Sequence, residues 1–269
     1  MKKVFLCMVM AVCCCVTGKA AEVVKGVSRE LATERAKTID DVTYDLVFDI
    51  PAQKSLPVKG TATLSFRWKG KQTLQIDFQG ESGQFDGHCT VNGHSCLVQW
   101  QNEHILIPRK LLRKGKNVVV MNFVSGDKSL NRNDDYLYTL FVPDHARSVF
   151  PCFDQPDLKA LFHARIHAPQ GWETLTSVST ERIPTYLFSF VAGKYQKKCV
   201  TRSGRTLTAL YRETDPKKVA QLDTVFDIAD RSIQWFEHYT GIHYPFSSYG
   251  FVVLPGYQFG GMEHPGAIQ

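Results

Sequence analysis

The sequence predicts a mainly β fold, an all-β sandwich followed by the start of an α/β unit. From residue 39 to about residue 213, short runs of alternating apolar and polar residues are separated by turn residues. After residue 213 the apolar residues recur every three or four positions, which is the period of a helix, and a short apolar strand follows. With 43% hydrophobic and 22% charged residues in a chain of 269, the composition is that of a globular protein rather than a disordered one.

The strands of the predicted sandwich are short alternating runs. The first covers residues 42–50 and stops at Pro51, and the second covers residues 60–68. The others are residues 74–78, 104–107, 117–124, 160–168, 173–178, 187–192 and 206–212, with the stretch Pro143–Pro156 ahead of residue 160. Regular short strands separated by turn signals are typical of a sandwich.

A hairpin is predicted at Asn92-Gly93, which favours a two-residue type I′ turn. Counting outward from the turn places Val91 opposite His94 and Cys89 opposite Cys96. Facing residues lie ~5.5 Å apart at Cα, which is within disulfide reach. Two free thiols are the plainer interpretation and a disulfide is the alternative. No Cys-x-x-Cys occurs after residue 20, so a cysteine zinc site is not indicated.

Residues 1–20 are predicted to be a secretory signal peptide. Two lysines precede the apolar run Val4–Val16, which is shorter than the ~20 residues of a membrane-spanning helix. Gly18 and Ala20 supply the small residues of a cleavage site after Ala20. The protein is therefore expected to be exported, to a periplasm or the extracellular space, with no membrane span after cleavage. Lipoprotein anchoring through the cysteines at positions 13–15 is the alternative.

Residues 21–38 form a polar segment in which Ser28 is placed to cap a short helix that ends near Lys37. Loss of residues 1–20 removes three lysines and no acid, which lowers the formal net charge from +6 to +3. No basic block remains, so nucleic acid is not indicated as a partner.

A long helix is predicted from Pro216 to Tyr239. Its apolar stripe is Val219, Leu222, Phe226, Ala229, Ile233 and Phe236. Asp215 occupies the N-cap position, Pro216 the first turn, and Gly241 the position just past the end. The change of period places a domain boundary near residue 213. Residues 39–213 are the predicted β-sandwich domain, and residues 214–269 are the predicted start of an α/β domain, incomplete in this chain.

The stretch Gly260-Gly261-Met262-Glu263 is the clearest candidate binding site. Glycines let another chain approach an edge strand closely, and the exposed backbone there can pair with an extended peptide. A carboxylate at the end of such an edge could bind a cationic group such as a free amine. A glycine turn followed by a surface glutamate is the plainer interpretation from pattern alone.

Two blocks of sequence resemble the aminopeptidase N family of zinc metallopeptidases, which includes enzymes of the leukotriene-hydrolase type. The first is Gly260-Gly261-Met262-Glu263, preceded by Tyr244-Pro245 and Val252–Pro255, and it resembles the family's Gly-x-Met-Glu-Asn exopeptidase signature. The second, from Ala146 to Ala160, looks like the family's Ala-Arg … Phe-Pro-Cys-Phe-Asp-x-Pro … Lys-Ala segment. The resemblance covers nearly all of the chain after residue 20.

The resemblance implies a saddle-shaped β-sandwich domain followed by the opening of a thermolysin-like catalytic domain. It further implies that Glu263 binds the α-ammonium of a peptide substrate and that the Gly260–Met262 backbone holds the first peptide unit. His264 stands where the family usually has Asn and is included in the predicted substrate-binding set, Gly260, Gly261, Met262, Glu263 and His264. Leu140 and Val142 align with positions at which many members carry Gln or Glu.

The implied cofactor is zinc, and its ligands are expected outside this chain. Family chemistry uses His-Glu-x-x-His and a later glutamate, yet none of the nine histidines here precedes a glutamate. His163 and His167 are four residues apart, but they lie in a predicted strand, so a metal site is not expected there. Asp154 lies in a proline-bracketed turn, where a structural role is expected. No catalytic or metal residue is therefore assigned within the chain.

The predicted function is that of the N-terminal part of an exported zinc aminopeptidase that removes residues from the amino ends of peptides. This chain by itself is expected to be inactive. The alternatives are a non-catalytic peptide-binding module and an epoxide hydrolase on the same scaffold. Peptides are the expected partners, and the sequence does not indicate an oligomeric state.

Overall fold

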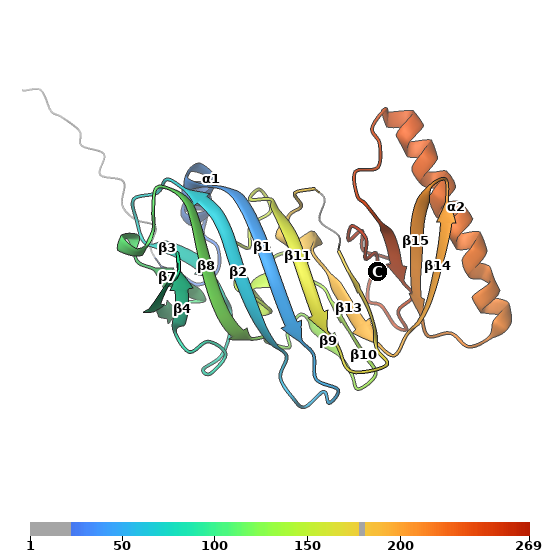
Figure 1. The fold of residues 1–269 in the computed structure, drawn as a ribbon, viewed down its shortest axis with the longest axis horizontal. Helices are drawn as coiled ribbons and strands as arrows, with labels where there is room; N and C mark the ends of the chain where they lie inside the picture. Colours follow the sequence, from blue (N-terminus) through green and yellow to red (C-terminus); the bar gives the residue numbers. More distant parts are fainter. Residues whose placement is uncertain (1–22, 178–180) are drawn as a thin grey trace, which may run out of the picture.

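Alternating residues build the largest sheet, in which one face of each long strand is buried. The computed structural model describes residues 23–177 and 181–269, so the predicted signal peptide, residues 1–20, lies outside the described residues. The six strands of this sheet run in the order β11 (Ala160–His167), β1 (Ile39–Asp49), β2 (Lys59–Trp68), β8 (Gly115–Val124), β4 (His88–Val91) and β5 (His94–Leu97). Strands β1 and β11 are parallel, and the other neighbours are antiparallel (Figure 1).

Two smaller sheets cover the buried face of the largest one. The first contains β3 (Leu74–Asp77), β7 (His104–Ile107) and β6 (Gln99–Gln101), and the second contains β12 (Glu173–Thr176), β13 (Phe190–Gly193), β10 (Tyr136–Thr139) and β9 (Leu130–Arg132). Short 3₁₀ turns lie at η1 (Arg109–Leu111), η2 (Ala146–Ser148) and η3 (Thr185–Leu187). Every residue of β3, β7 and β13 is buried, because these strands contact other segments on both faces. The predicted mainly β sandwich is confirmed.

The main core is rich in aromatic rings. Phe48, Phe150 and Phe188 are fully buried and lie in a chain of ring contacts with centroid separations of 6.1 Å and 5.7 Å. Phe162 stacks on Phe188 at 4.8 Å, which joins β11 to the segment that precedes β13. Such aromatic pairs contribute beyond the area that they bury.

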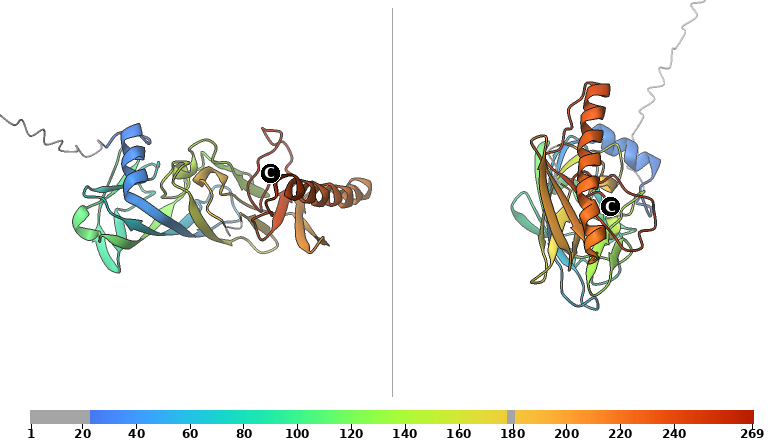
Figure 2. Two further views of the ribbon diagram at one scale, coloured as in Figure 1. Left: turned by 90° about the horizontal axis from the view of Figure 1, so that it is seen from above. Right: turned by 90° about the vertical axis from the view of Figure 1, so that its right-hand side faces the viewer.

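A third small sheet and a long helix form the C-terminal part of the molecule. Strands β14 (Gln196–Arg202) and β15 (Arg205–Tyr211) form a hairpin, and β16 (Tyr249–Val252) runs parallel to β15. The helix α2 (Pro216–Thr240) lies against this sheet at one end of an elongated molecule (Figure 2). Residues 196–211 were predicted to belong to the β-sandwich domain, whereas strands β14 and β15, which they form, share a sheet with β16 and pack against α2.

The ends of α2 follow the predicted capping pattern. The Asp215 side chain accepts a hydrogen bond from the backbone N–H of Lys217, and Gly241 adopts a left-handed conformation with φ of 70°. Leu222, Phe226, Ala229 and Ile233 of the predicted stripe are buried, but Phe236 is 58% exposed. The buried positions of the helix end at Ile233, so its last turns are exposed. No helix in the described ranges is long and apolar enough to cross a membrane.

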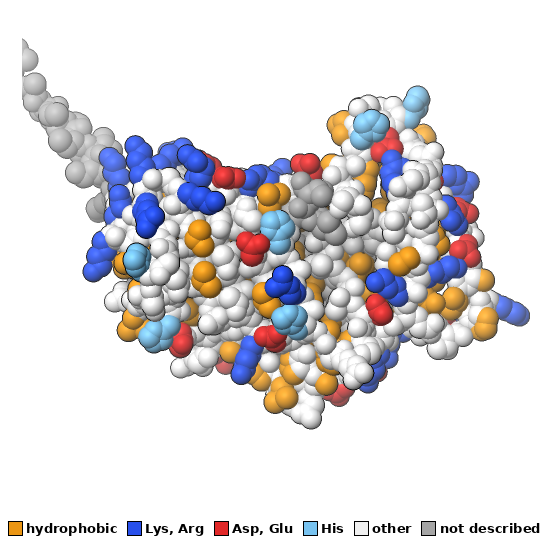
Figure 3. All heavy atoms as spheres, in the orientation of Figure 1, with side chains coloured by type: hydrophobic (Ala, Val, Ile, Leu, Met, Phe, Trp, Pro, Cys, Tyr) orange, Lys and Arg blue, Asp and Glu red, His pale blue; other side chains and the backbone are white. Residues whose placement is uncertain are grey.

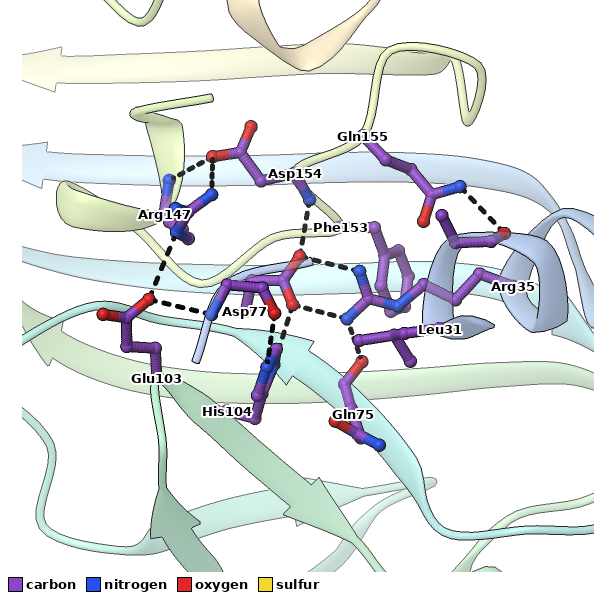
Figure 4. A network of polar contacts seen from close by, with 12 residues as sticks. Leu31, Arg35, Gln75, Asp77, Glu103, His104, Arg147, Phe153, Asp154 and Gln155 are labelled. Atoms are coloured by element: carbon purple, nitrogen blue, oxygen red, sulfur yellow. Dashed lines mark hydrogen bonds and ion pairs between the residues drawn. The ribbon is translucent and has the colours of Figure 1, made fainter. Parts of the chain in front are cut away.

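A buried carboxylate joins the N-terminal helix to the sheets. The helix α1 (Arg29–Thr38) is capped by Ser28, as predicted, and carries Arg35, which is 2% exposed (Figure 4). The Arg35 guanidinium donates to both oxygens of Asp77, at 2.7 Å and 2.5 Å. Asp77 also lies 2.9 Å from Nδ1 of His104 and accepts from the backbone N–H of Asp154 at 2.8 Å.

These contacts keep Asp77 ionised although it is fully buried. Burial alone would raise its pKa, but the Arg35 charge and the contacts with His104 and Arg35 outweigh burial and lower the pKa to about 2. The carboxylate therefore acts as a fixed negative charge that holds α1, β3, β7 and the 152–154 segment together.

Replacing Arg35 by Met is expected to reduce the free energy of unfolding by about 3–5 kcal/mol, because Asp77 would lose its main counter-charge while staying buried. Urea denaturation at pH 7 measures this change. Arg29→Met, on the exposed side of the same helix, is the matched control and should change the stability by less than about 0.5 kcal/mol. Equal effects of the two substitutions would contradict the assigned role of the buried pair.

Candidate active site

The predicted site residues lie in the segment that follows β16 and returns to its edge, where Ile268 pairs in parallel with Phe251. Val252 donates its backbone N–H to the carbonyl of Ile268 at 2.8 Å, and Ile268 donates to the carbonyl of Gly250 at 2.9 Å. This close approach explains the glycine in β16, because a Cβ at Gly250 would lie 2.5 Å from the carbonyl oxygen of Gly266. The returning segment thus extends the C-terminal sheet by one more neighbour.

The motif Gly260-Gly261-Met262-Glu263 lies on the outer side of this returning segment. Met262 and Gln269 exchange two backbone hydrogen bonds, of 2.6 Å and 3.0 Å, in an antiparallel pair. Apart from its neighbours in the chain, no described residue has an atom within 4 Å of the place where a Cβ of Gly260 would be, and the Glu263 side chain is exposed. Residues 260–263 are irregular rather than the edge strand that the sequence predicted, yet they occupy the outer position next to the sheet.

His264 points the other way and is fully buried. Its Nδ1 donates to the carbonyl of Leu187 at 3.0 Å, and its Nε2 has no hydrogen-bond partner among the described residues. Burial lowers the pKa of His264 to about 4, so the ring is neutral near pH 7. In this structure His264 anchors the segment to the turn η3, and its predicted part in substrate binding stays a prediction.

A second anchor holds the end of the segment. Nε2 of Gln269 donates to Oγ of Ser189 at 2.5 Å, and Oγ1 of Thr139 donates to the same hydroxyl at 3.2 Å. Ser189, Leu187 and Gln269 were not identified from the sequence. Their contacts with the motif span about 80 residues of chain, and no local pattern indicates such pairs.

Aromatic side chains flank the motif. Tyr257 meets Tyr138 of β10 edge-on with the ring centroids 5.6 Å apart, and Phe259 follows Tyr257 at 6.2 Å. Burial raises the pKa of Tyr257 to about 12, and the charges of Tyr138 and Glu263 act in the same direction. Tyr257 is therefore a neutral phenol near the Glu263 carboxylate.

The two positions that align with Gln or Glu in many family members carry apolar side chains here, one buried and one half-buried. Leu140 is 6% exposed and Val142 is half-buried. Neither side chain can donate or accept a hydrogen bond, so Glu263 is the anionic group that the motif offers to a cationic ligand.

The second sequence block, residues 146–160, lies in the buried network around Asp77 rather than beside Glu263. Asp154 is 4% exposed and accepts from the backbone N–H of Arg147 at 3.0 Å (Figure 4). Burial raises the pKa of Asp154 to about 7, with the nearby Asp77 charge adding to the shift. The hydroxyl of Tyr44 caps the same block by accepting from the backbone N–H of Phe153 at 2.8 Å. This arrangement supports the structural role expected for Asp154.

His163 and His167 lie on the exposed face of β11, where Figure 3 shows histidines beside acidic side chains. Each has its own partner on β1: His163 Nδ1 is 2.9 Å from Asp45, and His167 Nδ1 is 2.7 Å from Asp49. Within residues 23–177 and 181–269, no three His, Cys, Asp or Glu side chains gather as metal ligands would. The donor groups of the described chain therefore do not fit a zinc ion.

The β-sandwich and the exposed Gly-Gly-Met-Glu segment beside a helix and sheet agree with the fold that the resemblance to the aminopeptidase N family implies. Residues 125–187 match the sequence profile of the Peptidase M1 N-terminal domain. This match and the relatives below support the M1 aminopeptidase family that the two motifs predicted, for the N-terminal portion that this chain covers. Members of this family are generally zinc-dependent.

Known relatives match a larger share of the chain than the profile does. Aminopeptidase N of Streptomyces lividans is 26% identical over 269 aligned residues, which cover 90% of this chain and 31% of that protein. Endoplasmic reticulum aminopeptidase 1 of Mus musculus is 30% identical over 48% of this chain and 16% of its own length. Aminopeptidase N of Lactococcus lactis subsp. cremoris (strain MG1363) is 30% identical over 54% of this chain and 18% of its own length. The chain thus spans a third or less of the length of these relatives.

Acid should weaken the anchor at His264. The unfolded ring protonates below about pH 6.5, whereas the folded ring stays neutral down to about pH 4, so stability from His264 is complete above pH 6.5 and is lost as the pH falls toward 4. Between pH 7.5 and pH 5 the loss should be roughly 2 kcal/mol. His264→Asn, which can still donate to Leu187, should remove this loss.

The comparison requires urea denaturation of both proteins at both pH values. Asp154 contributes with the opposite sign, because its folded pKa of about 7 makes its contribution fall as the pH rises from about 4 to 7. Because both proteins contain Asp154, its contribution cancels when the change in stability of His264→Asn is subtracted from that of the wild type. An identical pH dependence of the two proteins would show that the His264 ring is not held neutral.

Proposed function

We propose that this chain is the N-terminal part of an exported, zinc-dependent aminopeptidase, in which Glu263 binds the free amine of a peptide. The observation that carries the proposal is the position of Glu263. It is exposed next to an open glycine backbone, while Met262 and His264 on either side are fixed by Gln269 and Leu187. The names of the relatives, all aminopeptidases, support the same reaction class.

The proposed role follows from simple electrostatics. A peptide that lies along Gly260 and Gly261 would place its terminal ammonium at the Glu263 carboxylate, and a charge-assisted hydrogen bond there is roughly twice as strong as a neutral one. Recognition of that single charge would limit cleavage to the first residue of the peptide. The Tyr257 and Phe259 rings nearby offer apolar contact to a side chain. Zinc, which polarises the scissile carbonyl in enzymes of this class, would be held by ligands outside this chain.

Binding of Leu-Gly-Gly to the chain without its predicted signal peptide tests the role of Glu263. Glu263→Gln should weaken binding about fivefold, or roughly 1 kcal/mol for an exposed ion pair. N-acetyl-Leu-Gly-Gly should bind the wild type as weakly as the free peptide binds Glu263→Gln. Calorimetric or NMR titration measures both, and Glu30→Gln, an exposed change on α1, is the matched control.

Equal affinity for the free and acetylated peptides would reject amine recognition by Glu263. A non-catalytic peptide-binding module is the second candidate, since an open glycine backbone suits peptide binding without any metal. An epoxide hydrolase on the same scaffold is the third.

The coding DNA beyond the Gln269 codon separates a zinc enzyme on this scaffold from the binding module. A frame that continues into His-Glu-x-x-His and a later glutamate would support the zinc enzyme, and an immediate stop would support the binding module. The chain itself should release no product from aminoacyl anilides when zinc is added. Turnover under these conditions would contradict the proposed division of the active site.

A further inference from the structure

Two thiols face each other on the hairpin formed by β4 and β5. Asn92 and Gly93 form the predicted turn, both with positive φ, and the register pairs Cys89 with Cys96 as the sequence indicated. The two Sγ atoms are 3.3 Å apart, and both cysteines are free thiols. Cys152 is buried elsewhere, with its backbone paired to Asp77, and Cys199 lies on β14 beside Thr208.

The turn holds the two cysteines in this register. The side chain of Asn92 donates to the carbonyl of Leu111 at 3.2 Å and to Asn117 at 3.0 Å, and its backbone N–H donates to Val118 at 2.8 Å. The hairpin therefore cannot slide relative to β8 without breaking these bonds. A disulfide has its sulfur atoms about 2.05 Å apart, so bond formation requires the thiols to approach by only about 1.3 Å.

We propose that Cys89 and Cys96 form a reversible dithiol–disulfide site that staples the edge of the largest sheet. The oxidant is a small-molecule disulfide, written here as RSSR. The Cys96 thiolate attacks one sulfur of RSSR and releases one thiolate RS⁻. The Cys89 thiolate then attacks the Cys96 sulfur and releases the second RS⁻. The protein loses two electrons and two protons, and RSSR becomes two RSH.

Access sets the order of these steps. Cys96 is partly exposed, whereas Cys89 is 5% exposed and lies against Met121 of β8 in the register. Burial, followed by the hydrogen bond with Cys96, raises the pKa of Cys89 to about 12. An external disulfide therefore meets Cys96 first, and Cys89 acts as the resolving thiol.

The disulfide would act on an edge strand of the largest sheet. β5 is the last strand of its sheet, and in the described chain it is paired with β4 alone. Its residues are exposed or half-buried, and Leu97 is 70% exposed. Edge strands of this kind open and pair with other chains readily. A covalent link to Cys89 would keep β5 paired with β4.

Incubation of the purified protein with oxidised glutathione, followed by alkylation and trypsin digestion, tests the proposal. The sequence has no Lys or Arg between Lys71 and Arg109, so both cysteines lie on one peptide, residues 72–109. That peptide should lose two hydrogens and become resistant to alkylation, and dithiothreitol should reverse both changes. Exchange of the β5 amides with deuterium should slow about tenfold on oxidation.

Two single variants test the order of attack. Cys89→Ser should accumulate a glutathione adduct on Cys96, whereas Cys96→Ser should leave Cys89 reduced. A peptide 72–109 that stays fully alkylated, or that carries glutathione on Cys96 in the wild type without losing two hydrogens, would overturn the proposal. An adduct on Cys89 in Cys96→Ser would overturn the assigned order.

Discussion

The β domain depends on the ion pair and hydrogen bonds that the buried Asp77 carboxylate makes. A lone charge in the core would cost several kcal/mol, so the fold must bring compensating groups to it. They come from three separate parts of the chain: Arg35 on α1, His104 on β7 and the backbone N–H of Asp154. Both ring nitrogens of His104 face acceptors, since Nε2 lies 2.9 Å from the carbonyl of Val24, and the N-terminal segment is thereby fixed to the same centre.

A continuous set of contacts leads from this centre to the candidate site. Phe153 follows the Asp77 bridge partner Cys152, and its carbonyl accepts from Oγ1 of Thr185 at 3.1 Å. Thr185 begins the turn η3, which ends at Leu187, and the carbonyl of Leu187 binds His264. The segment that carries Glu263 is therefore positioned by the β domain as well as by its own sheet. The block at residues 146–160 therefore helps to position the segment that carries the Gly260–Glu263 block.

The sequence predicted those features that local geometry determines. The hairpin register at Asn92-Gly93 and both caps of α2 were correct, because turn and cap chemistry act over a few residues. Strands β6, β9, β10 and β14 were not predicted, since they are short or carry several polar and charged residues that give no clear alternation. The Arg35–Asp77 pair and the His264–Leu187 bond join residues 42 and 77 positions apart. A single sequence holds no signal for such pairs.

The replacement of Asn by His at position 264 has a physical explanation in this arrangement. The side chain faces the interior and needs one donor for the Leu187 carbonyl, which an Asn amide and a neutral imidazole both supply. The imidazole, however, keeps this donor without a burial penalty only while it is uncharged. Glu263, whose carboxylate is exposed, is directly followed in the chain by His264, whose buried ring must stay neutral. Loss of that neutrality would loosen the anchor directly beside Glu263, so the geometry of the proposed amine site and the protonation of His264 are coupled through one peptide bond.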